Sequence, residues 1–370
     1  MRKIVFIIGF FSLLCGSLYA QGLPAFWNKL SNELNSYTET MEESSPPPFT
    51  PRTMAEWEEN QGILLSWGSG SYSDEIYDVL CEIIYHVLQE DDLNIFLVCL
   101  DSNSVKQYLD NEHDIQSPRI KYLLEHSLIG IWARDFGPMT IYENNIENYS
   151  LMDWKYADRE PGDGEVPQVL DDYLNIQRYE NNGDNDFSGI FEGGNFMCDG
   201  HGTAFSTEEY DNTHELFNGI TNSRWLDVNP LPFPCPNYNT DHIDIFMKML
   251  DEEAILVGRF SEGDNDYGLN DDIDANIAMI QTQCETHFGR QYKIHTIPMP
   301  SPTLYDWGDG LGWTFRSYTN SLIINKLVLV PTYDHISDDE AIAIYETLMP
   351  GYTVVPINCT ALDGSAGAIH

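Results

Sequence analysis

The feature that most constrains the fold is a regular alternation of apolar, strand-like runs with helical patterns. Residues 62–67 and 94–100 are apolar runs of strand length, and they flank residues 75–88, where apolar side chains recur at helical spacing. The same order returns at residues 254–258, 274–288 and 292–298, and again at 321–331, 338–349 and 353–357. Repeated strand, helix, strand units predict an α/β fold, but spacing alone does not distinguish wound, barrelled or propeller arrangements.

The first residues predict an export signal. Arg2 and Lys3 precede an almost unbroken apolar run at residues 4–14, and Ala20 closes a small-residue cleavage site. The run is shorter than the roughly 18 residues that a membrane-spanning helix needs. We therefore expect residues 1–20 to be a signal peptide and the mature protein to be secreted or periplasmic.

A proline-containing spacer is predicted between the signal and the folded domain. Pro46, Pro47 and Pro48 are consecutive, and such a run continues neither a helix nor a central strand. We assign residues 21–50 to this spacer and residues 51–370 to one folded domain.

The charge balance excludes several kinds of partner. The chain has 18 basic and 59 acidic side chains, which give a formal charge of −41 at pH 7. Repulsion of this size disfavours nucleic acids and anionic membrane surfaces. The surplus favours solubility of an exported protein and is also compatible with capture of cationic substrates.

Cysteine usage gives no metal or redox motif. Six cysteines follow the predicted signal peptide, and none forms a C-x-x-C pair. A chain of this length does not need disulfides to fold, so we expect mainly buried free thiols and leave any pairing open. Two acidic stretches, residues 180–186 and 262–274, are predicted to be exposed loops, and neither has EF-hand spacing.

Four short polar clusters adjoin apolar strand-like segments, at residues 132–138, 192–195, 241–244 and 318–320. Polar groups at strand ends beside glycines often build sites. Each cluster alone also has a structural explanation, such as Asp135 closing a turn. If residues 241–244 form a strand, His242 and Asp244 share one face of it. A metal site there has less support, because no third His or Cys lies at ligand spacing.

In combination, these clusters resemble the agmatine deiminase and bacterial peptidyl-arginine deiminase family of guanidine-modifying enzymes. The resemblance begins at Arg52-Thr53-Met54-Ala55-Glu56-Trp57-Glu58 and continues in order through the four clusters. Asp199-Gly200-His201-Gly202-Thr203 follows the Glu-Gly-Gly-Asn motif, and residues 363–370 look like the lead-in to the family's nucleophilic cysteine. Residues 50–370 are covered.

The resemblance implies a fold and a reaction. The fold would be a five-bladed, pseudo-symmetric α/β propeller of ββαβ-type repeats with the site on its axis. The reaction would be hydrolysis of a guanidinium group to a ureido group, with release of ammonia, through a covalent adduct on cysteine. Neither a metal nor an organic cofactor would take part, and the partner would be a small guanidine or an arginine-containing peptide.

The implied catalytic residues suit this chemistry. A guanidinium is planar and fork-shaped, so Asp135 and Asp244 can clamp it with paired hydrogen bonds. His242, with a pKa near neutral, would give a proton to the departing ammonia and take one from the attacking water. Asn320 would orient the reacting groups, and Glu192 would support the site or touch the substrate. Trp132, Asn195 and Arg159 complete the expected substrate-binding residues.

The cysteine itself is expected immediately after His370, as cysteine or selenocysteine, so the recorded sequence is expected to lack the C-terminal end of the domain. Cys359 has no matching context. Two alternatives are a guanidinium-binding protein that no longer reacts, and a related chemistry such as amidine transfer or methylarginine hydrolysis.

Substrate choice is expected to follow export. A secreted enzyme meets peptides, and Arg159 lies where the peptidyl branch binds carboxylates, so peptidyl-arginine is the leading substrate. Agmatine, which would give N-carbamoylputrescine for putrescine biosynthesis, is the alternative, since its cationic amine suits an acidic pocket. Asp241 stands where many members have glycine, whereas Lys248 is typical of the peptidyl branch.

Overall fold

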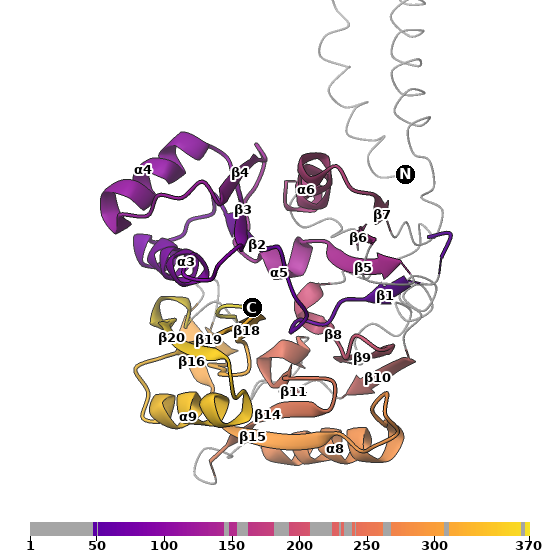
Figure 1. Cartoon of the computed structure of the whole chain (residues 1–370). Helices are drawn as coiled ribbons and strands as arrows, with labels where there is room; N and C mark the ends of the chain where they lie inside the picture. The colour runs from indigo at the N-terminus through magenta and orange to yellow at the C-terminus, as the bar shows by residue number, and fades with distance from the viewer. Residues whose placement is uncertain are drawn as a thin grey trace, which may run out of the picture. The chain divides into compact units, whose positions relative to one another are not determined.

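Short sheets of mixed strand direction, with helices between their strands, make up the described part of the chain (Figure 1). The structure, a computed structural model, describes residues 47–49, 51–143, 148–153, 162–180, 192–207, 224–228, 231–232, 239–240, 242–261, 268–306, 311–363 and 367–370. These residues all belong to one unit that spans Ser45 to His370. The predicted signal peptide, and all of the predicted spacer except residues 47–49, lie outside the described residues.

The strands are β1 (Pro51–Thr53), β2 (Gly62–Trp67), β3 (Asn94–Cys99), β4 (Ile120–Leu124), β5 (Met139–Glu143), β6 (Tyr149–Asp153), β7 (Arg178–Glu180), β8 (Met197–Cys198), β9 (Thr203–Thr207), β10 (Arg224–Val228), β11 (Leu231–Pro232), β12 (Asn239–Thr240), β13 (Met247–Met249), β14 (Ala254–Phe260), β15 (Lys293–Met299), β16 (Thr303–Asp306), β17 (Leu311–Thr314), β18 (Leu322–Ile324), β19 (Leu327–Thr332) and β20 (Thr353–Asn358). The helices are α3 (Asp74–Val87), α4 (Ser102–His113), α5 (Ala133–Phe136), α6 (Val166–Leu174), α8 (Leu269–Gln283) and α9 (Asp338–Leu348). Short 3₁₀ turns are η1 (Asp163–Glu165), η2 (Gly193–Asn195), η4 (Ile243–Ile245) and η5 (Thr360–Leu362).

Five sheets of three or more strands occur among the described residues, in the orders β2-β3-β4, β1-β5-β6-β7, β10-β9-β8, β13-β14-β15 and β18-β19-β20. In four of them an antiparallel pair is followed by a parallel one, as in β13-β14-β15. The sheet β2-β3-β4 differs, because both of its pairs are parallel. The predicted strand, helix, strand units are β2-α3-β3, β14-α8-β15 and β19-α9-β20, which confirms the α/β class.

Two predicted elements have different bounds in the structure. Helix α8 begins at Leu269, five residues before the predicted start, so the last six residues of the second predicted acidic loop are helical. Its buried side chains, Leu269, Ile273 and Ile280, follow helical spacing, and Gly268 precedes them with a left-handed φ of 73°.

The run at residues 321–331, predicted as one strand, is a hairpin of β18 and β19. Ile324 pairs with Leu327, so Asn325 and Lys326 form a two-residue loop. Asn325 has a φ of 52°, and asparagine tolerates this left-handed conformation better than most residues. The turn signal was therefore a single asparagine within an apolar run.

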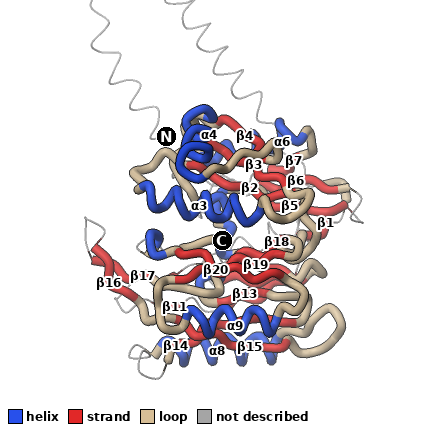
Figure 2. The backbone as a smooth tube through the Cα atoms, turned by 60° about the vertical axis from the view of Figure 1, so that its left-hand side comes forward, coloured by secondary structure: helices blue, strands red, loops and turns tan. Residues whose placement is uncertain are grey.

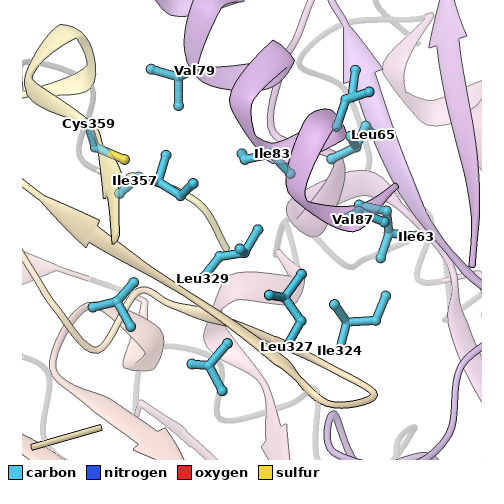
Figure 3. Close-up of a cluster of buried hydrophobic side chains, with 14 of the residues drawn as sticks. Ile63, Leu65, Val79, Ile83, Val87, Ile324, Leu327, Leu329, Ile357 and Cys359 are labelled. Atoms are coloured by element: carbon cyan, nitrogen blue, oxygen red, sulfur yellow. The ribbon is translucent and has the colours of Figure 1, made fainter. Parts of the chain in front are cut away.

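One hydrophobic core joins the first and last sheets of the described chain. It contains Ile63 and Leu65 of β2, Ile83 of α3, and Leu329 and Ile357 of β19 and β20 (Figure 3). Helix α3 contacts β20, and it lies beside the sheet β18-β19-β20 in both views (Figures 1 and 2). The sheet β2-β3-β4 and its helix α3 are thus packed against the sheet β18-β19-β20.

Further cores join neighbouring sheets in sequence order. One contains side chains of β3, β4, β6 and α6, a second contains side chains of β5, β6, β8 and β9, and a third joins β8 and β9 to β13, β14 and α8. Leu250, Ala254 and Leu256, around β14, lie in the core that also contains β18 to β20. Each of the five sheets therefore shares a core with the sheet that follows it.

A matched pair of isoleucines tests this packing. Ile84 of α3 is fully buried in the shared core, whereas Ile336 is 94% exposed. We expect Ile84→Ala to lower the free energy of unfolding by about 2–5 kcal/mol, because it leaves a cavity. Ile336→Ala should change it by less than about 0.5 kcal/mol. Denaturant unfolding measures both, and equal effects would contradict the assigned core.

Candidate active site

The predicted site residues lie in short segments that come just before strands of four sheets. Asp135 belongs to α5, which precedes β5, and Glu192 precedes η2 and β8. His242 and Asp244 come just before β13, and Asn320 just before β18. Because these motifs occupy the same place in successive sheets, residues far apart in the sequence can converge.

His242 is the centre of this convergence. Its Nε2 lies 2.6 Å from Glu192 Oε2, a hydrogen bond. Its Nδ1 lies 3.7 Å from Asp135 Oδ1 and 4.0 Å from Asp244 Oδ1. The structure therefore brings together four of the residues that the sequence predicted: one imidazole and three carboxylates.

The His-x-Asp pair is not on a strand, contrary to the expectation. Residues 243–245 form the turn η4, with His242 as the residue before it. Ile243 and Ile245 point into the core shared by β9, β13 and β14, which leaves Asp244 directed toward His242. The apolar neighbours, rather than strand alternation, orient the carboxylate.

Two glycines let the segments approach this closely. A Cβ on Gly194 would lie 2.5 Å from His242 Nδ1 and 3.0 Å from Asp135 Oδ1. A Cβ on Gly193 would lie 2.1 Å from the carbonyl oxygen of Arg134. The Gly194 N–H donates to Asp135 Oδ1 over 3.1 Å, so the glycine backbone also holds the aspartate.

Arg134 ties the Asp135 segment to the Glu192 segment. Its Nε donates to the Gly193 carbonyl (2.9 Å) and its guanidinium to the Phe196 carbonyl (2.8 Å). No role was predicted for Arg134 from the sequence, although this residue directly precedes Asp135 in the same motif.

The cluster shifts the pKa values of its members. Burial raises the pKa of Asp135 to about 6, against the opposing effect of the His242 charge, and Glu192 and Asp244 raise it further. Burial opposes protonation of His242, but the charge of Asp135, the hydrogen bond to Glu192 and the charge of Asp244 outweigh it and raise its pKa to about 10. In the protein alone His242 is therefore an imidazolium at pH 7, rather than the near-neutral group expected.

Asp244 offers one oxygen to the cluster. Its Oδ2 accepts a hydrogen bond from His370 Nδ1 over 2.8 Å. Its Oδ1 is buried and has no hydrogen-bond partner among the described residues. A donor that enters the cluster thus finds an unsatisfied acceptor there, whose satisfaction would lower the free energy of the complex.

Asn320 holds the backbone before and at His370. Its Oδ1 accepts from the backbone N–H groups of Ala368 (2.9 Å), Ile369 (3.2 Å) and His370 (3.2 Å). Asn320 was expected to orient the reacting groups, and in the structure it orients the backbone of residues 368–370. Trp132 packs on the same segment, because a Cβ on Gly367 would lie 3.1 Å from its ring.

The structure does not support substrate contact by Asn195. Its side chain is fully buried; its Oδ1 accepts from the N–H groups of Thr207 and Ile243, and its amide nitrogen donates to Thr207 Oγ1. Asn195 therefore fixes η2 against β9 and η4. Arg159 and Asp241, which carried two further expectations, lie outside the described residues.

The described cysteines do not reach the cluster. Cys81, Cys99, Cys198, Cys284 and Cys359 are buried and free of disulfides. Burial raises the pKa of Cys198 to about 12 and holds that of Cys359 well above its usual range. Such thiols are poor nucleophiles at neutral pH, which agrees with leaving Cys359 out of the reaction.

A cavity of about 660 Å³ lies next to the cluster, but the residues of the cluster do not line it. Its lining includes Glu56, Trp132, Arg134, Gly193 and His370 but neither Asp135 nor His242. Its other walls include apolar side chains of β2 and α3 and the carboxylates of Glu58 and Glu59. We assign the cation chemistry to the carboxylates around His242, because the Glu56 and Glu58 carboxylates in the cavity wall are already paired with Lys248 and Arg52.

Three residues of the cluster also have a spacing that metal ligands can have. Asp135, Glu192 and His242 each present one ligand atom within 4.8 Å of the others. Such a grouping is also compatible with a metal ion, which sequence spacing did not indicate.

Among the described residues no helix has the length and apolar character needed to cross a membrane.

Comparison with known proteins places the chain among hydrolases that act on the C–N bonds of linear amidines. The family model for the Porphyromonas-type peptidyl-arginine deiminase matches residues 52–370. The chain belongs to this family.

Individual relatives agree with this family. An agmatine deiminase of Pseudomonas putida is 26% identical over 305 residues, which are 72% of this chain and 79% of that protein. An agmatine deiminase of Stutzerimonas stutzeri matches to the same extent. The solved agmatine deiminase of Enterococcus faecalis shares the fold, with a TM-score of 0.70 at 20% identity over 87% of this chain and 94% of that one.

The shifted pKa values predict how cation binding depends on pH. A bound guanidinium favours the ionised form of Asp135 and the neutral form of His242, so the complex holds fewer protons than the free protein. Affinity for a guanidinium should therefore rise as the pH increases through about 6, where Asp135 loses its proton, and continue to rise toward 10.

Calorimetry with agmatine between pH 5 and 8, in buffers of different ionisation enthalpy, measures affinity and proton release together. Asp135→Asn is the control and should remove the rise around pH 6. Equal affinities at pH 5 and 7, with no proton release, would contradict the assigned ionisation states.

Proposed function

We propose that this protein is an agmatine deiminase, which converts the guanidinium of agmatine to a ureido group and releases ammonia. The observation that carries the proposal is the acidic cluster of Asp135, Glu192 and Asp244 around His242. A guanidinium placed there has carboxylate acceptors on two sides, and Asp244 Oδ1 has no hydrogen-bond partner within the described part of the chain.

The residues divide the reaction between them. Asp135 and Asp244 Oδ1 hold the guanidinium and fix its carbon for attack. A thiolate adds to this carbon, and ammonia leaves with the proton that His242 donates. Water then attacks the thiouronium carbon and gives one proton back to His242. The thiolate is expelled, and the second proton of the water passes to the released ammonia. The sum is guanidinium plus water giving a ureido group plus ammonium.

His242 suits the first of these steps. Before the substrate binds, its imidazolium is stabilised by three carboxylates. A second cation beside it lowers its pKa, so the proton becomes available to the leaving group. Glu192, bonded to Nε2 over 2.6 Å, orients the ring in both protonation states.

We place the nucleophile at the position that follows His370, where the sequence predicts a cysteine. Support comes from the local geometry: Asn320 fixes the backbone of residues 368–370, and the His370 side chain reaches Asp244. The next residue in the chain would thus start beside the acidic cluster. A chain without a thiolate there would bind guanidines but not hydrolyse them.

Agmatine is favoured as the substrate by the relatives and by charge. The similar proteins of Pseudomonas putida and Stutzerimonas stutzeri are named agmatine deiminases. Agmatine carries a second cation, which suits a chain of net charge −41. This reverses the order expected from the sequence, in which export put peptidyl-arginine first.

Peptidyl-arginine remains the second candidate, because the matching family model bears that activity in its name. Arg159 would supply the positive partner for a carboxylate, and the predicted signal peptide at residues 1–20 would bring the enzyme to extracellular peptides. Citrulline formation and export are thus linked parts of this second proposal.

We further infer that the five sheets are the blades of a five-bladed propeller of ββαβ-type units. Two observations support the inference. Each sheet shares a core with the next, and the last shares one with the first. In addition, the four site motifs precede strands β5, β8, β13 and β18, which belong to four successive sheets.

Two chains test the function. One is extended by a cysteine after His370 and the other by a serine, and both are assayed for ammonia release from agmatine and from an arginine peptide blocked at both ends. We expect turnover only with cysteine, and a higher kcat/KM for agmatine. Preference for the peptide, weakened by Arg159→Ala, would support the second candidate. Ammonia release by the serine chain or by the 370-residue chain would overturn the nucleophile assignment.

A further inference from the structure

Glu56 joins three segments of the chain beside the acidic cluster. Lys248 Nζ donates to Glu56 Oε1 (2.7 Å) and Oε2 (2.6 Å), and the Ile323 N–H donates to Oε1 (2.7 Å). His370 Nε2 lies 3.2 Å from Oε2. Glu56 follows β1, Lys248 is on β13, and Ile323 is on β18. One carboxylate thus links the start, the middle and the end of the domain.

The partner of Glu56 is a lysine with almost no access to water. The Lys248 side chain is 1% exposed, and its Nζ also donates to the Ser321 carbonyl over 2.5 Å. Burial opposes ionisation of Glu56, but the charges of Lys248 and His370 outweigh it and keep the pKa of this carboxyl below its usual range. A buried ion pair adds little net stability compared with apolar side chains of the same size. Stability is therefore a weak reason for this pair to be present.

His370 connects the pair to the site. Its Nε2 faces Glu56 and its Nδ1 donates to Asp244 Oδ2 over 2.8 Å, while its side chain is only 3% exposed. The contact with Glu56 is an ion-pair distance of 3.2 Å without hydrogen-bond geometry, whereas the contact with Asp244 is a hydrogen bond. The buried ring therefore lies between the two carboxylates, and its hydrogen bond orients Asp244. The oxygen that remains, Oδ1, faces His242 and the place assigned to the guanidinium.

We propose that Glu56 and Lys248 are positioning residues for the guanidinium site: through His370 they hold Asp244 so that its Oδ1 points into the acidic cluster. The chain Lys248, Glu56, His370, Asp244 is continuous within contact distance from a buried ammonium to the substrate carboxylate. The choice of a guanidinium as ligand rests on the proposed function, but the positioning itself does not.

The competing explanation is that the ion pair only packs β1, β13 and β18 together. The two explanations separate in the double variant Glu56→Gln/Lys248→Met, which removes both charges and leaves no charge unpaired. Its thermal stability should return close to that of the native chain, whereas Lys248→Met alone leaves Glu56 buried without its cation. Glu58→Gln is the matched control, because Glu58 lies on the same loop but pairs with Arg52.

Calorimetry with agmatine at pH 7 gives the first readout. Native chain and Glu58→Gln should bind equally, and the double variant roughly tenfold more weakly, about the loss of one well-placed hydrogen bond. If the double variant does not fold, Glu56→Asp replaces it: it keeps a charge for Lys248 but withdraws the carboxylate from His370, and should show the same loss. Native affinity in a folded double variant, or in Glu56→Asp, would overturn the proposal.

The second readout needs no ligand. In protein with ¹⁵N-labelled histidine, the Nδ1 proton of His370 should give a protected, low-field resonance that persists in Glu58→Gln and is lost in the double variant. Persistence in the double variant would overturn the proposal even if agmatine binding fell. Failure of the native chain to bind agmatine or any other guanidine would instead contradict the proposed function, and the His370 resonance would still test the positioning.

Discussion

Mutual repulsion of buried carboxylates is the constraint on which this structure depends. Asp135, Glu192 and Asp244 come from segments that precede three different sheets, and three such groups cannot remain ionised together in a buried site without a cation. The imidazolium of His242 supplies that charge in the protein alone, and its raised pKa is the consequence. A substrate cation can replace this charge, which links binding of a guanidinium to the proton that the reaction then needs.

The sheets provide the geometry for this arrangement. The site motifs come shortly before strands β5, β8, β13 and β18 of four different sheets, and shared cores hold each sheet against its neighbours. Gly194 leaves room for both Asp135 and His242, and Gly193 leaves room for the Arg134 carbonyl oxygen. Backbone placement and charge thus act together: the fold brings the carboxylates close, and the central imidazole makes that proximity tolerable.

The sequence predicted the class of fold and named the four residues that meet at His242, because their signals are local. Apolar runs such as residues 62–67 and 94–99 are read directly as strands, and the ordered motifs containing Asp135, Glu192 and His242 indicate the site through family resemblance. Local signals also explain the errors. Asp244 lies in a turn because two flanking isoleucines are buried, which alternation alone does not reveal.

Contacts between distant segments could not be predicted in this way. Glu56, Lys248 and His370 lie far apart in the sequence, and only the folded chain shows that they form one connected group. Asn195 has the residue type of a ligand-binding group, yet its amide is used entirely within the protein. Residue type indicates what a side chain can do, whereas its partners decide what it does.

The central claim is that the carboxylates around His242, and not the neighbouring cavity, hold a guanidinium. A crystal structure of the 370-residue chain with agmatine tests this most directly. We predict guanidinium nitrogen atoms within hydrogen-bond distance of Asp135 and of Asp244 Oδ1, with His370 still bonded to Asp244 Oδ2. A guanidinium found in the 660 Å³ cavity, with Asp244 Oδ1 still without a partner, would contradict the account.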